Sequence, residues 1–171
     1  MDKRWIYILI ILILALISGY YAVMQSTNVG SAITNINTSL ITMPADFEVS
    51  HSSAKSVELG NGKTAENIYL EDFGKTHDAF ERYENNLKET EDYDDLSNIR
   101  NSTNTTSTSI KYYTVRYENT TSGINVSKTY FEKNNHTFYL KLTNYKNETS
   151  YNSDLRFIID NLTPDYKKGK D

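Results

Sequence analysis

The residues best able to carry out chemistry are few and widely separated along the chain. The three histidines, His51, His77 and His136, lie 26 and 59 positions apart, which gives no metal-ligand spacing. The sequence contains no cysteine, so a disulfide, a thiolate metal site and a cysteine nucleophile are excluded. It also lacks a phosphate-binding glycine loop and a Gly-Xaa-Ser-Xaa-Gly turn. We therefore expect neither enzymatic activity nor a cofactor.

One acidic stretch is a weak candidate for a metal site. It places five carboxylates within seven residues and could hold Ca²⁺ loosely; they are Glu89, Glu91, Asp92, Asp94 and Asp95. The stretch has neither the alternating spacing nor the glycine of a calcium-binding loop. A solvated helix end explains it better, so we expect no bound metal.

Aromatic and basic side chains alternate at Tyr139, Lys141 and Tyr145. Aromatic residues are enriched in contact surfaces, so these three could hold a protein partner or stack on sugars. Alternatively, the tyrosine rings extend a small core while their hydroxyls stay in water. We favour this second interpretation and retain the first as a possible binding face.

Asn-Xaa-Ser/Thr, the acceptor sequence for N-glycosylation, occurs more often than the composition alone predicts. The excess is explained either by an exported, glycosylated surface or by an Asn- and Thr-rich composition. The eight sites are Asn37, Asn101, Asn104, Asn119, Asn125, Asn135, Asn147 and Asn161.

The segment Trp5–Met24 is apolar at 18 of 20 positions, and a helix of that length spans the roughly 30 Å hydrocarbon core of a bilayer. Lys3 and Arg4 precede it, which predicts a cytoplasmic N-terminus and an exported remainder. The alternative is a cleaved signal, but cutting after Ala22 would place the bulky Tyr20 where a small residue is needed. We therefore expect a single-pass signal anchor in the cell membrane.

The composition changes sharply after this segment. The net charge of −4 argues against nucleic-acid binding, which normally requires a basic surface. A polar, aperiodic stretch follows the apolar run and predicts a flexible stalk. The expected organisation is a cytoplasmic tip and anchor over 1–24, a stalk over 25–39, a domain over 40–166 and a charged tail over 167–171.

The first half of the domain predicts three short strands and a helix. Asn61-Gly62 is a strong hairpin signal between two of the strands. Thr76 and Asp78 offer a helix start, and an apolar stripe then runs through Phe80, Tyr83 and Leu87 at helical spacing to about Thr90. The strands are expected within Leu40–Val49, Ser56–Leu59 and Ala65–Leu70.

The second half predicts three strands and a closing helix, with an exposed loop over Asn98–Ser109 before them. The helix has one continuous apolar stripe and ends before Pro164; the stripe comprises Tyr151, Leu155, Ile158, Ile159 and Leu162. The strands are expected at Ile110–Glu118, Ile124–Glu132 and Thr137–Thr143. Because tight hairpins join antiparallel strands, this order predicts an α+β fold in which two helices cover an antiparallel sheet of about six strands.

The domain resembles the PsbP-like family, which shares its fold with the nuclear-transport factor Mog. The resemblance rests on the segment MPADFEV (Met43–Val49), on the β-β-β-α-β-β-β-α order and on the closing helix around Asp154–Leu162. It implies an α/β/α sandwich and a non-catalytic module that docks on or helps assemble a membrane complex. Short membrane-anchored proteins of methanogenic archaea look similar. No photosynthetic motif is present, so the family's partner is not carried over.

Two functions therefore stand open. The first is a non-enzymatic, membrane-anchored, extracytoplasmic domain that binds or helps assemble a membrane or envelope protein complex. The second is a binding module for an envelope polysaccharide or a small ligand. A closed aromatic-lined cleft would favour the ligand, whereas a flat tyrosine-rich face would favour a protein partner.

Overall fold

The computed structural model divides into two compact units, Met1–Gly30 and Ser31–Asp171. All residues that the structure describes lie in the second unit: 33–36, 39–75, 78–91, 93–145 and 147–165. The predicted membrane anchor and the charged tail lie outside these ranges. Within them, no helix has the length and apolar character needed to cross a bilayer.

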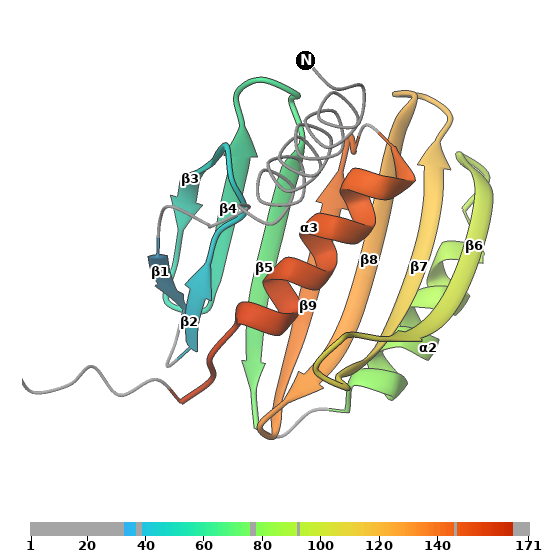
Figure 1. The fold of residues 1–171 in the computed structure, drawn as a ribbon. Coiled ribbons are helices and arrows are strands. Elements are labelled where there is room, and N and C mark those ends of the chain that lie inside the picture. The colour runs from blue at the N-terminus through green and yellow to red at the C-terminus, as the bar shows by residue number, and fades with distance from the viewer. Residues whose placement is uncertain (1–32, 37–38, 76–77, 92, 146, 166–171) are drawn as a thin grey trace, which may run out of the picture. The chain divides into compact units, whose positions relative to one another are not determined.

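Seven strands form one sheet, and two helices and a separate hairpin accompany it (Figure 1). The strands are β3 (Phe47–Ser52), β4 (Ser56–Asn61), β5 (Asn67–Gly74), β6 (Leu96–Thr105), β7 (Lys111–Asn119), β8 (Ile124–Lys133) and β9 (His136–Thr143). The helices are α2 (Ala79–Glu91) and α3 (Glu148–Asn161), and the hairpin is β1 (Ile33–Ile36) with β2 (Ser39–Thr42). The sheet order is β3-β4-β5-β9-β8-β7-β6, with every neighbouring pair antiparallel. The predicted α+β class is confirmed.

Each helix begins at a side chain that satisfies its free amide groups. Asp78 Oδ1 accepts hydrogen bonds from the amides of Phe80 and Glu81, at 2.7 and 3.0 Å. Asn147 Oδ1 accepts from Thr149 and Ser150 in the same way, as N-cap residues do. The predicted start at Asp78 is thus correct. α3 lies across β5, β9 and β8, while α2 lies behind β6, β7 and β8 on the opposite face (Figure 1).

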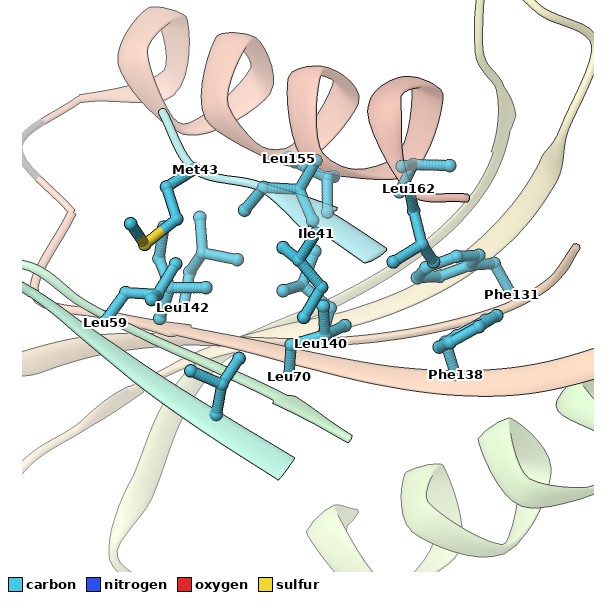
Figure 2. Packing of buried hydrophobic residues seen from close by; sticks show 14 of the residues in the cluster. Ile41, Met43, Leu59, Leu70, Phe131, Phe138, Leu140, Leu142, Leu155 and Leu162 are labelled. Atoms are coloured by element: carbon cyan, nitrogen blue, oxygen red, sulfur yellow. The ribbon is translucent and has the colours of Figure 1, made fainter. Parts of the chain in front are cut away.

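The main core lies between the sheet and α3. The alternation predicted for β9 is confirmed, because Phe138, Leu140 and Leu142 all point into this core and are fully buried. The predicted stripe of α3 is buried against them. The hairpin completes the cover, since Ile41 lies between Leu155 of α3 and Leu140 of the sheet (Figure 2).

The prediction of an exposed loop over Asn98–Ser109 is wrong. The sheet has seven strands, where about six were expected. Most of that segment is β6, which pairs with β7 from Leu96 to Thr105. The strand escaped prediction because it is an edge strand with mostly exposed side chains. Its polar residues therefore need not alternate with apolar ones, although threonine is itself a good strand former.

The boundary expected between stalk and domain also differs from the structure. β1 and the first residue of β2 lie within the stretch 25–39 that the sequence predicts as stalk. The hairpin is held to the end of α3 because Leu40 and Thr163 exchange two backbone hydrogen bonds of 2.9 Å. The return strand β5 begins at Asn67, two residues after the predicted Ala65.

Candidate functional site

The sheet face under α2 is built largely of tyrosine. Cross-strand pairing aligns Tyr113 with Tyr130 and Tyr130 with Tyr139. The rings of Tyr130 and Tyr139 have centroids 5.1 Å apart, and the ring of Tyr83 from α2 lies 5.6 Å from that of Tyr113. We call this surface the tyrosine face; its sheet residues are Tyr69, Tyr113, Tyr117, Tyr130 and Tyr139.

Burial raises the pKa of four tyrosines of this face, Tyr69, Tyr117, Tyr130 and Tyr139. It raises the pKa of Tyr130 to about 12, with a smaller contribution from the carboxylate of Glu89. Burial also raises the pKa of Tyr139, and the neighbouring Tyr130 adds to the effect. Tyr69 donates its hydroxyl proton to Glu71 Oε2 at 2.9 Å. The face therefore presents neutral hydrogen-bonding groups rather than phenolates.

A cavity of about 360 Å³ lies where α2 meets the tyrosine face. We call it the α2 cavity; it is lined by Glu71, Phe73, Arg82, Asn85, Asn86, Glu89, Tyr130 and Tyr139. The Arg82 guanidinium lies over the Phe73 ring, 3.8 Å from its centroid. Asn86 Oδ1 is buried and has no hydrogen-bond partner within the described structure. A buried acceptor without a partner is costly, and this one belongs to a residue that lines the cavity.

The outward surface of α2 and its flanks carries a concentrated negative charge. Residues 78–95 contain eight acidic and two basic side chains, a net charge of −6, whereas the whole chain has −4. The remaining residues therefore sum to +2. All seven of the acidic residues in this segment that the structure describes are exposed. None of the seven forms a salt bridge with another described residue.

Two aromatic side chains near the ends of α2 are open to solvent. Phe80, in its first turn, is 44% exposed, and Tyr93, just after its last, is 64% exposed. No N-glycosylation sequence occurs between Asn37 and Asn101, so α2 lies in a stretch without such acceptors. Together with its charge, these features make α2 the element of the described structure most suited to contact a partner.

A second cavity, of about 720 Å³, lies beside the first turn of α2. Its charged side chains already hold the fold together. Glu132 accepts from the amide of Ala79 at 3.0 Å, and Lys133 donates to the carbonyls of Ile159 and Asp160. Asp160 accepts from Ser107 and Thr108 in the β6–β7 turn, and these hydrogen bonds lower its pKa against the opposing effect of burial.

A buried polar cluster joins β5, β9 and the hairpin. His136 Nδ1 lies 3.0 Å from both carboxylate oxygens of Asp72, and Ser39 donates to Asp72 Oδ2 at 2.9 Å. His136 Nε2 lies 3.3 Å from Asp165, whose pKa is lowered mainly by its hydrogen bond from Lys75. A nucleophilic triad needs the serine on the histidine. Here the serine binds the aspartate and both are fully buried, so the cluster is structural.

His51 does not belong to this cluster. His51 is exposed on the edge strand β3, and His77 lies outside the described residues. Within the described ranges, no three His, Cys, Asp or Glu side chains gather as metal ligands. Of the acidic stretch, Glu89 lines the α2 cavity, Glu91 ends α2, and Asp94 and Asp95 form the turn before β6. Asp92 lies outside the description.

The possible binding face expected from the sequence is only partly assembled. Tyr139 and Lys141 do share the face under α2, but Tyr145 does not. Its ring packs against Tyr151 of α3, 4.8 Å away between centroids, on the opposite side. The reason is local, because Asn144 has a φ of 59° and ends the period-two alternation that would have placed Tyr145 beside them.

The described N-glycosylation sequences lie on β6–β9 and α3. Asn119 and Asn147 use their side-chain oxygen to close a turn and cap a helix, and Asn135 has the left-handed φ of 63° that its turn requires. Asn161 donates to the Phe157 carbonyl. These four asparagines thus have local structural roles, whereas no such hydrogen bond is seen for the exposed Asn101, Asn104 and Asn125; Asn37 lies outside the described residues.

Sequence reasoning missed three features of this region. The concentration of charge on residues 78–95 could have been found by counting charges in windows along the chain. The free acceptor of Asn86 and the cavity it lines could not, because they depend on how closely α2 approaches β8 and β9. The Asp72–His136 contact also leaves no local signal, since the pairing of β5 with β9 creates it.

Comparison with known proteins identifies no family for this chain. No protein-family model matches the sequence, and no curated protein matches it. A crystal structure from Bacteroides thetaiotaomicron VPI-5482, determined at 1.50 Å resolution, aligns with 78% of this chain at 15% identity and a TM-score of 0.41. The aligned part is 47% of that protein, about half its length. A likeness at this level carries no argument about fold or function.

Proposed function

We propose that this protein is a non-enzymatic, membrane-anchored binding domain that faces away from the cytoplasm and uses α2 to contact a partner protein in a membrane or envelope complex. The anchor and the orientation rest on the apolar segment Trp5–Met24 and on the basic residues before it. The observation that carries the binding role is α2 itself. It combines uncompensated charge with the exposed side chains of Phe80 and Tyr93.

The resemblance to the PsbP-like family supports this proposal only through the sequence features described above. Two of these features are the segment Met43–Val49 and the closing helix around Asp154–Leu162. The strand order differs, because four strands rather than three lie between the two helices. The assembly role that the family implies agrees with the binding role proposed from α2, but the two rest on separate grounds.

Binding of a polysaccharide or small ligand is the second candidate. The observation that favours it is the 720 Å³ cavity, which falls in the size range of ligand sites and is lined by Phe80 and Tyr113. It ranks second because the charged groups of that cavity are engaged in holding helix ends and turns. Few polar groups remain to orient a sugar.

Site-specific crosslinking in the native membrane tests the proposed function. A photoreactive residue replaces Tyr93 at the end of α2, and a matched one replaces Lys55, exposed between β3 and β4. We expect a defined protein to be captured from position 93 and not from position 55. Capture of the same background species from both positions would contradict the proposal. Protease added to intact cells should remove the domain, and full protection would show the orientation to be wrong.

A further inference from the structure

The α2 cavity and the acidic surface both lie along α2. Both lack a partner that is positively charged or donates hydrogen bonds. Outside, seven exposed carboxylates have no salt-bridge partner among the described residues. Inside, Asn86 Oδ1 is a buried acceptor without a donor. Glu89 belongs to both, because it is exposed on α2 and also lines the α2 cavity. A ligand that satisfies both must bring positive charge and hydrogen-bond donors.

From this geometry we propose that α2 docks a lysine- or arginine-rich segment of the partner protein, and that one basic side chain of that segment enters the α2 cavity. There its ammonium or guanidinium group donates to Asn86 Oδ1 and pairs with the Glu89 carboxylate. Lysine and arginine side chains carry only donors, and charge-assisted hydrogen bonds are the stronger class. This inference rests on the proposed function and names the chemistry of its partner.

The cations already present leave room for this side chain. The Arg82 guanidinium lies on the Phe73 ring at the cavity wall. The Lys128 ammonium lies 5.5 Å from the centroid of the Tyr117 ring, and burial together with Lys141 lowers its pKa. In the described structure no salt bridge joins Lys128 or Lys141 to Glu89. The Glu89 carboxylate acts on Lys128 only at a distance and raises its pKa slightly against burial, so a basic side chain arriving along α2 meets carboxylates that form no salt bridge within the described structure.

The exposed aromatic residues and the pattern of acceptor sequences favour a polypeptide as the source of this charge. Phe80 and Tyr93 flank the acidic surface, and aromatic anchors within a charged rim are typical of protein interfaces. No N-glycosylation sequence falls on α2, so no glycan attached there would keep a partner away. An anionic membrane surface, by contrast, would be repelled by the net charge of −6 on residues 78–95.

A titration with synthetic peptides tests the inference on the full chain in detergent. The probe is a labelled peptide of about 16 residues that alternates lysine and serine, and its control replaces each lysine by glutamate. We expect the lysine peptide to bind and the glutamate peptide not to. Raising the salt from about 50 mM to about 500 mM should weaken binding about tenfold or more, because the surface charges become screened.

Three variants locate the site. Glu89→Gln and Asn86→Leu should each weaken binding about fivefold, since each removes one cavity partner. Glu58→Gln, an equal loss of charge at an exposed position on β4, should change it less than twofold. Thermal unfolding of each variant separates lost binding from lost folding. Equal affinity in the wild type and both cavity variants would overturn the inference, as would binding of the glutamate peptide or self-association in place of peptide binding.

The crosslinking experiment separates this inference from the function on which it rests. If a defined protein is captured at position 93 and the segment it contacts has no excess of lysine or arginine, the inference fails and the function stands. If no protein is captured and the lysine peptide does not bind, both fail. Binding of anionic vesicles or of an envelope polysaccharide at the same cavity residues would also overturn the inference.

Discussion

The sheet face under α3 and the sheet face under α2 are built from the same strands but carry different side chains. Under α3 the cover is continuous, because the helix and the β1–β2 hairpin together bury an almost entirely aliphatic and phenylalanine core. Under α2 the side chains are mostly tyrosine, and the helix packs against β6, β7 and β8. One face is closed and mainly apolar, and the other is amphipathic and partly open.

This difference shows how a small domain can use one face of its sheet for stability and the other for recognition. Burying aliphatic side chains yields stability with no polar groups to satisfy, so the α3 side holds the fold. Tyrosine rings give contact area while their hydroxyls remain able to bond, so the α2 side can remain partly open without losing its packing. The α2 cavity and the free Asn86 acceptor occur on the second side, although the buried Glu66 Oε1 also lacks a partner among the described residues.

Leu140→Ala should produce the largest effect, because Leu140 is fully buried in the α3-side core. We expect a loss of about 4 kcal/mol in the free energy of unfolding. Lys141→Ala, one residue later and on the other face, should cost less than about 1 kcal/mol. Urea unfolding of both variants measures the contrast. Similar losses of unfolding free energy in the two variants would contradict the proposed difference between the two faces.

His136→Ala should come next, at a cost of about 3 kcal/mol, because it leaves the buried Asp72 carboxylate without its main partner. The α3 side buries a second polar contact as well, the 2.8 Å hydrogen bond between Ser127 and Tyr151. The control is His51→Ala, on an exposed edge strand, which should cost less than about 0.5 kcal/mol. If the two histidine variants unfold at the same urea concentration, the buried pair does not contribute as the geometry implies.

Glu66→Gln should stabilise the protein at high pH by about 2 kcal/mol and leave it unchanged near pH 4. Burial, and to a smaller extent the charge of Asp154, raises the pKa of Glu66 from 4.5 to about 7. The folded state therefore holds this proton more tightly than the unfolded chain, and stability falls as the pH rises from about 4.5 to about 7. Urea unfolding at several pH values tests this.

Glu58→Gln, at an exposed site, serves as the control for the pH series. It should retain the wild-type pH dependence. An unchanged slope in Glu66→Gln would mean that the buried carboxyl does not titrate between the two pH limits. Asp154, whose pKa burial raises to about 6, should give a change of the same sign when it is replaced by asparagine.

Glu84→Gln should have the smallest effect on stability, under about 0.5 kcal/mol, because the side chain is exposed on α2 and unpaired within the described structure. Binding of the lysine peptide should nevertheless weaken measurably, since α2 loses one carboxylate. Thermal unfolding and the peptide titration are compared on the same sample. A variant that loses stability but not binding would reverse the roles assigned to the two faces.

The sequence predicted the elements whose side chains alternate between a buried and an exposed environment. β9 and α3 were found because each has one strictly apolar side, and α2 because Asp78 and the stripe after it mark its beginning. In the turn between β8 and β9, Asn134 and Asn135 both have the left-handed φ that such turns need.

The rest depends on contacts that no local pattern records. β6 is an edge strand whose residues face solvent, so its polar composition resembles that of a loop. Tyr145 packs on the other side of the sheet from Tyr139 because a single left-handed residue, Asn144, breaks the alternation. For the site, the aromatic members of the tyrosine face were partly foreseen, whereas the α2 cavity and the free acceptor of Asn86 arise from the distance between helix and sheet.

The pairing of Leu40 with Thr163 has a consequence for the order of folding. Leu40 lies near the start of the described residues and Thr163 near their end, and their two hydrogen bonds bring the hairpin to the end of α3. Contacts between such distant positions form late, because a long loop must close first. During synthesis the hairpin must therefore wait until nearly the whole domain has left the ribosome before it can dock. Until then, Ile41 and Met43 remain exposed to any chaperone that binds apolar segments.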